Sequence, residues 1–380
     1  MRIGMCSDMY TPHVSGVTNH IRLYKKHFED LGHEVFVFTF GDRDHVDSEP
    51  NVYRTPAVSW GDTGWNFAPY YSLESKELLR TMDVIHAHHP FQSGRLAASI
   101  ATKAGIPLVF TNHTRYDLYS DAYAPLVPQG PRYGTLKLFL KKFLDDCGCV
   151  VAPSKSIEGW LRTFIGCDHV VTVPNGIDIA KFAEPATVLT REDLGLREDD
   201  FVFIYLGRVA PEKNTDYLFS EFFEMAANND HAKMLVVGAG PELEKAKAMA
   251  ARHELGNRLI FTGMQPYDLL PSYAHLADAF VTGSVSEVHP LVVLEAMAAG
   301  LPIVAVSSPG ISDTVEQGRS GLLAKTPTPS LLAIEMNTLI NNAGLRDRLA
   351  AGASERIKDY SFANTADVVL AYYEQLIQNK

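Results

Sequence analysis

Two glutamates, Glu287 and Glu295, flank a point where the sequence predicts that a strand gives way to a helix. An apolar run at 278–284 precedes them, Pro290 can take the first helical position and Gly300 can end the helix. We therefore expect Glu287 in a loop at the carboxyl end of a parallel strand, where open α/β sheets bind ligands, and Glu295 two turns into the helix. Such a pair suits a polyhydroxylated ligand, and a phosphate would meet the helix N-terminus between the two carboxylates.

Two cations follow another strongly apolar run, 201–206. They lie in the segment Gly207-Arg-Val-Ala-Pro-Glu-Lys213, and we expect Arg208 and Lys213 to converge above the strand end. Arginine offers a fork for phosphate oxygens and lysine adds a point charge, which suits a departing nucleoside diphosphate. A solvated strand end with two surface cations is the alternative. The two glutamates in the same half of the chain favour the functional interpretation.

Two glycine-containing turns also follow predicted strands. Gly16 lies where the first strand passes into a helix, and its lack of a side chain would let a phosphate approach the helix start; a plain helix start is the alternative. The turn Val237-Gly-Ala-Gly-Pro-Glu242 is not a dinucleotide fingerprint, because Leu243 occupies the place of the third glycine. It is either a loop near a nucleotide or simple turn chemistry.

Several histidines stand at strand ends of the first half. His113 follows the strand predicted at 108–111, so it is a candidate site residue, with a structural role as the alternative. On a strand, His86 and His88 would share one face and His89 would point away. Because no carboxylate or cysteine stands at ligand spacing, we expect these three to be structural or to line a cleft, and we expect no metal site.

Asp42 and Asp44 imitate the metal-binding acidic pair of a fold known as GT-A. That fold would leave the second half of the chain unexplained, so we interpret the two aspartates as a solvated turn.

Short apolar runs alternate with helical patterns along the whole chain, which predicts βαβ units and parallel sheets. We expect two doubly wound domains, residues 1–175 and 176–361, with a cleft between their strand ends. A final helix at 362–377 carries apolar residues at helical spacing: Val368, Val369, Tyr372, Tyr373 and Leu376.

The composition is that of an ordinary globular protein, with 380 residues, 46% of them hydrophobic and 21% charged. A net charge of -11 argues against general nucleic-acid binding, and four cysteines make neither a disulfide framework nor a paired zinc pattern. No apolar run reaches about 18 residues, and the first residues predict a strand rather than a signal peptide, so a cytoplasmic enzyme is the expectation.

The stretch Ser286-Glu-Val-His-Pro-Leu-Val-Val-Leu-Glu-Ala-Met-Ala-Ala-Gly-Leu-Pro302 resembles the signature of the retaining nucleotide-sugar glycosyltransferases of family 4, which have the GT-B fold of two facing Rossmann-like domains. The resemblance implies that the first glutamate contacts the donor sugar, the second holds the ribose, and the last helix packs back on the N-terminal, acceptor-binding domain. The family usually has Phe-Gly where this chain has His289 and Pro290. With Leu291 and Val292, these two residues complete the expected donor-binding segment.

The same resemblance places Arg208, Lys213 and Gly16 at the donor diphosphate and His113 near the anomeric carbon of the sugar. It implies that the sugar is transferred with its configuration retained and that no metal cofactor is needed. The resemblance also implies that the donor is a UDP-hexose similar to UDP-glucose. A nucleotide-sugar epimerase of the same fold and a non-catalytic sugar-nucleotide sensor remain alternatives.

The acceptor side is predicted from the first half of the chain. Residues 132–144 read as a helix with an apolar side (Leu136, Phe139, Leu140, Phe143 and Leu144) and with Lys137, Lys141 and Lys142 on or beside the other side. Such a helix can rest on anionic lipid at the inner face of the membrane, or it can be an ordinary packed helix; both interpretations stay open. The passage 113–154 resembles bacterial enzymes that glucosylate diacylglycerol, which favours a lipid acceptor.

Overall fold

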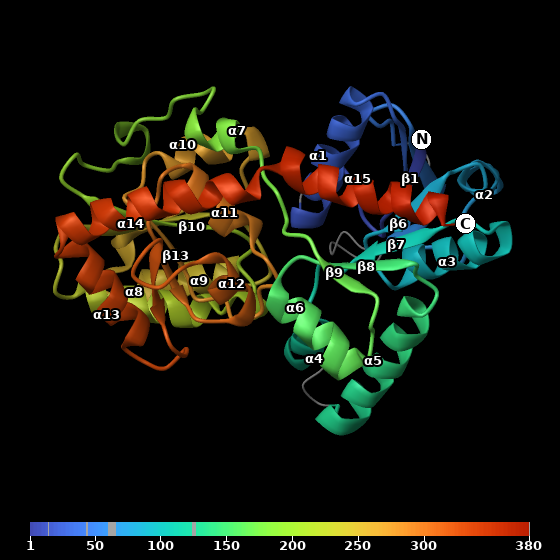
Figure 1. Ribbon diagram of the computed structural model, residues 1–380. Coiled ribbons are helices and arrows are strands. Elements are labelled where there is room, and N and C mark those ends of the chain that lie inside the picture. Colours follow the sequence, from blue (N-terminus) through green and yellow to red (C-terminus); the bar gives the residue numbers. More distant parts are fainter. Residues whose placement is uncertain (14, 43–44, 60–65, 124–126, 380) are drawn as a thin grey trace. The chain divides into compact units, whose positions relative to one another are not determined.

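The computed structural model describes residues 1–13, 15–42, 45–59, 66–123 and 127–379, and they form two compact units. The first unit contains Met1–Ser120, the described part of Ala124–Gly176, and the C-terminal segment from Phe362. The second contains Ile177–Ser361 together with Asp121–Tyr123. Each unit is built on a parallel sheet between helices (Figure 1), as the alternating pattern predicted.

The sheet of the first unit has seven parallel strands in the order β3-β2-β1-β6-β7-β8-β9. The strands are β1 (Arg2–Cys6), β2 (Glu34–Gly41), β3 (Val52–Pro56), β6 (Val84–Ala87), β7 (Leu108–Thr111), β8 (Cys149–Ala152) and β9 (Val170–Thr172). A small antiparallel pair, β4 (Val58–Ser59) and β5 (Asn66–Phe67), is separate from it. The order reverses direction beside β1, because β2 lies on one side of β1 and β6 on the other. That switch point is where open α/β sheets place ligands.

The helices of this unit are α1 (Gly16–Asp30), α2 (Leu73–Leu79), α3 (Gln92–Ala104), α4 (Tyr116–Tyr123), α5 (Gln129–Leu144), α6 (Lys155–Trp160) and α15 (Phe362–Gln378), with a π-helical turn at Leu161–Ile165. The C-terminal helix α15 lies beside α1 (Figure 1), and the Tyr24 hydroxyl donates a hydrogen bond to the Thr365 hydroxyl. Val369 and Tyr373 of α15 are buried in the core of this unit. Val368, another of the apolar residues at helical spacing in α15, is 45% exposed.

The sheet of the second unit has six parallel strands in the order β12-β11-β10-β13-β14-β15. The strands are β10 (Phe201–Leu206), β11 (Ala232–Val237), β12 (Leu259–Gly263), β13 (Ala279–Thr282), β14 (Ile303–Val306) and β15 (Gly321–Ala324). Along β10, Phe203 and Tyr205 join the core on one face, while Val202, Ile204 and Leu206 join the core on the other. A strand buried on both faces must be apolar at every position, which explains its continuous apolar run.

Helices cover both faces of this second sheet. They are α7 (Ile179–Ala183), α8 (Thr215–Ala226), α9 (Leu243–Arg252), α10 (Leu270–Ala274), α11 (Leu291–Ala298), α12 (Pro309–Thr314), α13 (Leu331–Ile340) and α14 (Ala343–Arg356). Short 3₁₀ turns occur at Glu192–Leu194, Pro211–Lys213, Gly256–Arg258, Tyr267–Leu269 and Ile357–Tyr360.

Helix α5 packs on its own unit through much of the side that the sequence marked as apolar. Leu140, Phe143 and Leu144 are buried, and the Phe139 ring stacks on Phe91 with centroids 5.5 Å apart. Leu138 is 74% exposed and lies off that side. This packing favours the ordinary-helix interpretation for the predicted apolar side, so a membrane would have to meet the opposite side of α5.

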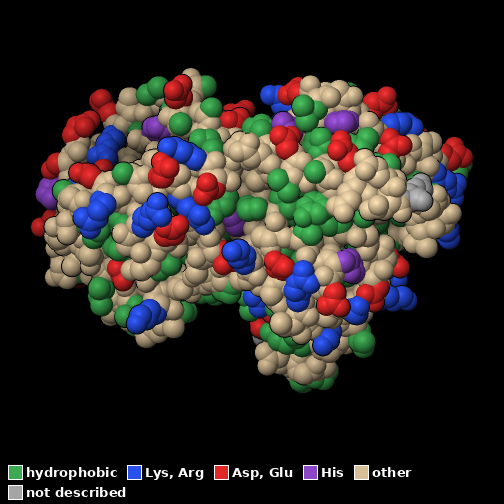
Figure 2. Space-filling view, in the orientation of Figure 1, with side chains coloured by type: hydrophobic (Ala, Val, Ile, Leu, Met, Phe, Trp, Pro, Cys, Tyr) green, Lys and Arg blue, Asp and Glu red, His purple; other side chains and the backbone are tan. Residues whose placement is uncertain are grey.

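The surface bears charge of both signs. On the face shown in Figure 2, Lys and Arg side chains are intermingled with Asp and Glu rather than gathered in one field. Within the described residues, no helix is both long enough and apolar enough to cross a membrane.

Candidate active site

An ion pair joins two predicted site residues of the second unit. Lys213 ends the 3₁₀ turn after β10, Glu287 lies in the loop after β13, and the Lys213 Nζ is 2.7 Å from the Glu287 Oε1. The carboxyl ends of β10 and β13 are neighbours because the two strands pair directly in the sheet. Both side chains are partly exposed, so an amine and a carboxylate remain accessible to a ligand at this edge.

Hydrogen bonds from side chains to backbone carbonyl oxygens hold the two loops that carry this pair. The Asn214 side-chain amide donates to the Gly283 carbonyl oxygen (3.2 Å), and the Ser286 hydroxyl donates to the Glu212 carbonyl oxygen (2.8 Å). On the other side, a Cβ placed on Gly310 would lie 2.3 Å from the Glu287 carbonyl oxygen, which is too close for any side chain. Helix α12 can therefore approach the Glu287 loop only because residue 310 is glycine.

Arg208 lies two residues after β10 but does not join the Lys213–Glu287 pair. Its side chain is 50% exposed, and its Nη1 is 3.7 Å from the buried Glu212 carboxylate. The Tyr205 hydroxyl donates to the Arg208 carbonyl oxygen over 2.7 Å and so fixes the backbone there. The guanidinium thus stands on a fixed backbone with much of its surface available to an anion.

The glycine turn at 238–240 has a structural reason. The Val209 amide donates to the Ala239 carbonyl oxygen over 3.0 Å, and a Cβ on Gly240 would lie 2.3 Å from the Val209 carbonyl oxygen. The turn packs directly against the backbone that carries Arg208. Close backbone approach therefore accounts for glycine at 240, whether or not a nucleotide lies near.

Helix α11 begins one residue later than predicted. Pro290 is its N-cap in extended conformation, Leu291 is the first helical residue, and Gly300 follows the helix with φ of 79°. The first amides of the helix, beginning at Leu291 and Val292, have no carbonyl partner within the helix by geometry and can face an anion. His289 is buried against the Tyr360 ring (centroids 5.2 Å apart), and burial lowers the pKa of its imidazole to about 4, so it is neutral at pH 7.

Glu295 is the fifth residue of α11, so it lies closer to the helix start than the two turns predicted. It is 2% exposed, and its Oε1 accepts a hydrogen bond of 2.9 Å from the Tyr267 hydroxyl. Burial raises the pKa of Glu295 to about 7, although the Tyr267 hydrogen bond and the nearby Lys181 charge oppose the rise. Near neutral pH this carboxyl group is therefore poised between its two protonation states.

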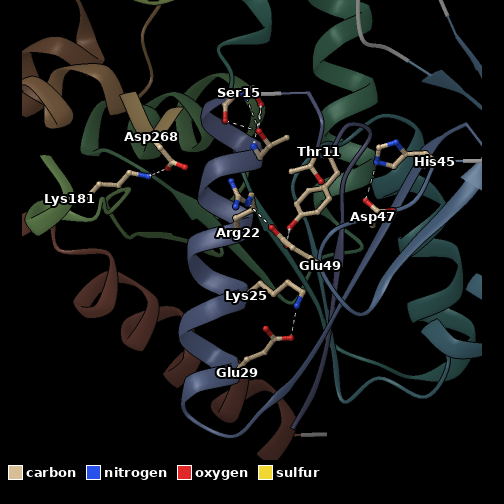
Figure 3. Close-up of polar contacts among 12 residues, drawn as sticks. Thr11, Ser15, Arg22, Lys25, Glu29, His45, Asp47, Glu49, Lys181 and Asp268 are labelled. Carbon is tan, nitrogen blue, oxygen red and sulfur yellow. Dashed lines mark hydrogen bonds and ion pairs between the residues drawn. The ribbon is translucent and has the colours of Figure 1, made fainter. Parts of the chain in front are cut away.

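Tyr267 and Lys181 are residues that the sequence analysis did not single out. The Lys181 Nζ lies 4.4 Å from the centroid of the Tyr267 ring and pairs with Asp268 (Figure 3). Lys181 belongs to α7. These contacts join segments more than 80 residues apart in sequence, and the sequence carried no motif for them.

In the first unit, Gly16 is the exposed first residue of α1. Ser15 caps the helix: its hydroxyl accepts from the Thr18 amide, and the Thr18 hydroxyl accepts from the Ser15 amide (Figure 3). A reciprocal cap of this kind satisfies amides that a phosphate would otherwise contact. The helix start was predicted correctly, and the contact of Gly16 with a diphosphate remains a prediction.

His113 follows β7 and is half-buried beside other histidines. Its Nε2 lies 3.1 Å from the Nδ1 of His88, which follows β6. The ring centroids of His113 and of His20 on α1 are 5.0 Å apart. His86 and His88 lie on the same side of the strand, as the alternation predicted, with ring centroids 4.2 Å apart. His89 instead contacts the Ser7 hydroxyl and the Asp8 amide, each at 3.2 Å from its Nδ1.

The acidic pair at Asp42 and Asp44 is described in part. Asp42 is exposed in the chain that follows β2, which agrees with a solvated turn. Asp44 lies outside the described residues.

Two family matches divide the chain as its two units do. Residues 14–181 match the family described as "Glycosyltransferase Family 4", and residues 189–356 match "Glycosyl transferases group 1". Among solved structures, a sucrose-phosphate synthase from Thermosynechococcus elongatus superposes with a TM-score of 0.80 at 20% identity, covering all of both chains. Anabaena HepE, solved in complex with UDP and glucose, superposes with a TM-score of 0.79 at 21% identity, covering 99% of this chain and all of HepE. At these identities the likeness shows the GT-B fold.

Sequence relatives extend the match over most of the chain. An alpha-monoglucosyldiacylglycerol synthase from Streptococcus pneumoniae is 30% identical over 332 residues, which covers 85% of this chain and 75% of that protein. A protein of the same name from Acholeplasma laidlawii is 29% identical, covering 85% of this chain and 84% of that protein. The chain therefore belongs to the family 4 glycosyltransferases of the GT-B fold, enzymes that transfer a sugar from a nucleotide sugar to an acceptor.

Proposed function

We propose that the chain transfers glucose from UDP-glucose to diacylglycerol, with retention of the anomeric configuration. The observation that carries this proposal is the Lys213–Glu287 pair, because a cation and a carboxylate 2.7 Å apart at one sheet edge could serve the leaving diphosphate and the sugar hydroxyls. The names of the two synthases, which specify an alpha-linked monoglucosyldiacylglycerol, support the sugar, the acceptor and the linkage.

Charge in the second unit would drive departure of the nucleotide. An ammonium group has three donors, so Lys213 can keep Glu287 with one of them and contact a phosphate oxygen with another. Arg208 would add a forked contact, and the first amides of α11 would meet the same diphosphate. These groups would stabilise the negative charge that develops as the bond from the sugar to the diphosphate breaks.

The two carboxylates would hold opposite ends of the donor. Glu287 would accept hydrogen bonds from the glucose hydroxyls, while Glu295 would accept both ribose hydroxyls of the nucleotide. Glu295 is already fixed by Tyr267 at 2.9 Å, so it can bind the ribose without losing side-chain freedom. In the first unit, His113 would contact the reacting glucose.

Retention follows if the acceptor attacks the face from which the diphosphate leaves. A bond forms between the acceptor oxygen and the anomeric carbon, the bond to the diphosphate breaks, and the acceptor proton passes to a diphosphate oxygen. This route needs no second carboxylate as a covalent nucleophile. It suits a site in which Glu287 is already paired to a lysine.

We also propose that α5 meets the membrane at the inner face of the cell. Lys137 and Lys142 are exposed together with Leu138, so this side of α5 offers two cations and one large apolar group. Lys141 is partly neutralised by its ion pair with Asp145. The contact is therefore expected to be weak and sensitive to salt.

The transfer is tested by incubating the protein with UDP-glucose and vesicles that contain diacylglycerol, with matched vesicles that lack it. We expect UDP release only when diacylglycerol is present, and an α-linked glucolipid by NMR. A β-linked product would refute retention. A donor isomerised without acceptor would identify an epimerase, and an unchanged bound donor would identify a sensor.

Membrane contact is tested separately by sedimentation with vesicles rich in anionic lipid. The double substitution Lys137→Glu and Lys142→Glu should lower the bound fraction several-fold. Lys26→Glu with Lys103→Glu is the matched control, because both lysines are exposed on other helices of the same unit and the net charge changes equally. Equal loss in both doubles would show general electrostatics rather than a contact through α5.

A further inference from the structure

His88, which follows β6, directly contacts His113, which follows β7. The two strands pair in the sheet, so their carboxyl ends bring the two side chains together. The His88 Nδ1 and the His113 Nε2 are 3.1 Å apart, and the two rings are nearly parallel, with an interplanar angle of 23°. His88 is buried, whereas His113 is half-buried. The contact is therefore anchored at its buried end, and His113 keeps some surface for a ligand.

This contact is the one hydrogen bond that the His88 ring makes within the described part of the chain. The His88 Nε2 is buried there without a partner. The His88 ring packs against His86, with centroids 4.2 Å apart, and His86 is itself held by the hydroxyl groups of Thr111 (2.7 Å) and Tyr373. A ring packed on a fixed neighbour and with a single polar contact has nothing that competes with His113 for its Nδ1.

The hydrogen bond ties the protonation pattern of one ring to that of the other. Burial, together with the neighbouring histidines, holds the pKa values of His88 and His113 well below their usual range, so both rings are neutral at pH 7. A neutral imidazole has one N–H donor and one acceptor nitrogen, so only one of the two facing nitrogens carries a proton. In either arrangement the Nε2 of His113 is occupied by His88, and its Nδ1 is left for a ligand.

The backbone that carries His113 is fixed separately from its ring. The Asn112 backbone amide donates to the Val151 carbonyl oxygen (3.0 Å), and the Asn112 side-chain amide donates to the Thr114 carbonyl oxygen (3.1 Å). These bonds hold the main chain on both sides of His113. The imidazole itself can still turn about its two side-chain torsions, and the hydrogen bond to His88 restrains that turning.

We propose that His88 is a positioning residue, which holds the His113 imidazole through its Nε2 and so presents the His113 Nδ1 to a hydroxyl group of the donor sugar. This inference rests on the proposed function, which assigns His113 to the reacting glucose. It gives a role to a histidine for which the sequence predicted only a structural or cleft-lining place. A ring that is already held can bind a hydroxyl group without losing further side-chain freedom.

Two variants of residue 88 separate its hydrogen bond from its bulk. His88→Leu removes the nitrogen and keeps an apolar group of similar size, whereas His88→Asn keeps a polar atom on Cγ, where Nδ1 stood. With UDP-glucose and diacylglycerol vesicles, His88→Leu should lower kcat/KM about 3- to 10-fold, and His88→Asn should recover most of that loss. His33→Leu is the matched control and should be as active as wild type, since the His33 Nδ1 makes its own 3.1 Å contact with the N-terminal amine.

A double-mutant cycle shows whether His88 acts through His113. The double variant His88→Leu with His113→Ala should be as active as His113→Ala alone, within about twofold, because the contact is already gone. With UDP-glucose analogues that each lack one hydroxyl group, the effect of His88→Leu should vanish for the same analogue as the effect of His113→Ala. Additive losses, effects that vanish for different analogues, or a folded His88→Asn as impaired as His88→Leu would overturn the proposal.

A measurement without substrate keeps this inference separate from the proposed function. In protein labelled with ¹⁵N in its histidines, NMR distinguishes the N–H nitrogen of each ring from the bare one. We expect a single tautomer of His113 in wild type and in His33→Leu, and a mixture of both tautomers in His88→Leu. Circular dichroism melting identifies which variants are folded, and His88→Phe, which also lacks the nitrogen, replaces His88→Leu if that variant does not fold.

The two failures are then distinguishable. The same tautomer ratio of His113 in wild type and in the folded variant without the His88 nitrogen would overturn the positioning role, even if wild type transfers glucose. A changed ratio in a protein that transfers no glucose would support the hold of His88 on His113 and refute the proposed transfer instead.

Discussion

Nucleotide-sugar binding should weaken as the pH falls through about 7, because Glu295 must be ionised to accept both ribose hydroxyls. Burial raises the pKa of this carboxyl group from 4.5 to about 7 in the unliganded protein. If only the carboxylate form binds, the apparent Kd equals the intrinsic Kd divided by the ionised fraction of Glu295. With a pKa near 7, the Kd at pH 6 should be about tenfold higher than at pH 8.

Tyr267 sets the position of this transition. Its hydroxyl donates to Glu295 at 2.9 Å and stabilises the charged form, so it lowers the carboxyl pKa. A hydrogen bond to a charged group is worth about 1.5–3 kcal/mol, so Tyr267→Phe should move the midpoint upward by about one to two pH units. At pH 7 the variant should bind about 5- to 50-fold more weakly than wild type.

Calorimetry with UDP-glucose between pH 6 and 8.5 measures both effects. UDP-glucose is chosen because its diphosphate is esterified at both ends and lacks the phosphate ionisation that free UDP undergoes near pH 6. Tyr217→Phe is the control, since the Tyr217 hydroxyl donates to the Thr328 carbonyl oxygen instead. A wild-type Kd that does not change with pH would refute the role of Glu295 ionisation. An unchanged midpoint in Tyr267→Phe would refute the role of Tyr267.

Four further outcomes are expected. Arg208→Ala and Lys213→Ala should each lower kcat/KM at least about tenfold, and activity within twofold of wild type in both would remove them from the mechanism. Glu295→Ala should weaken the binding of free UDP, whereas Glu287→Ala should leave UDP binding unchanged and impair use of the intact donor. An equal loss of UDP binding in both variants, measured by calorimetry, would refute that division. Transfer should continue in EDTA, and complete loss restored by Mn²⁺ would contradict the diphosphate contacts proposed here. Glu295→Gln should raise the Tm of nucleotide-free protein at pH 8 but little at pH 5. Burial raises the pKa of Glu295 in the folded protein, so the stability that its protonated form contributes is fully present below about pH 4.5 and is lost as the pH rises through about 7. The free energy of unfolding should change by about 3 kcal/mol over that range. Equal Tm changes at both pH values would contradict this.

Local patterns predicted the fold well where one strand is buried on both faces or one helix has a clear end. The run that became β10 and the glycine after α11 are examples. Two strands of the parallel sheets, β3 and β15, were not predicted, and neither was the short antiparallel pair β4 and β5. β3 is an edge strand, Val-Tyr-Arg-Thr-Pro, whose polar residues weaken the apolar signal, and β15 is a short edge strand of four residues.

The contacts within the site were harder to predict from the sequence because they join residues far apart in the chain. Lys213 and Glu287 are 74 positions apart, and Tyr267 and Glu295 are 28 apart. Each residue type was informative alone, but their pairing depends on which strands are neighbours in the sheet. His88 and His113 are the clearest case, since they are 25 positions apart in sequence and the pairing of β6 with β7 brings them together.

The two units present different chemistry at their strand ends, and this difference bears on which part of the substrates each can hold. The second unit offers charge, with Arg208, Lys213 and Glu287 near the surface and Glu295 close to its ionisation point. The first unit offers histidines that burial keeps neutral at pH 7. Neutral imidazoles can bond hydroxyl groups but add little to the binding of a dianionic diphosphate. Diphosphate affinity should therefore depend on the second unit, whereas substitutions of His88 or His113 should act on the sugar or the acceptor.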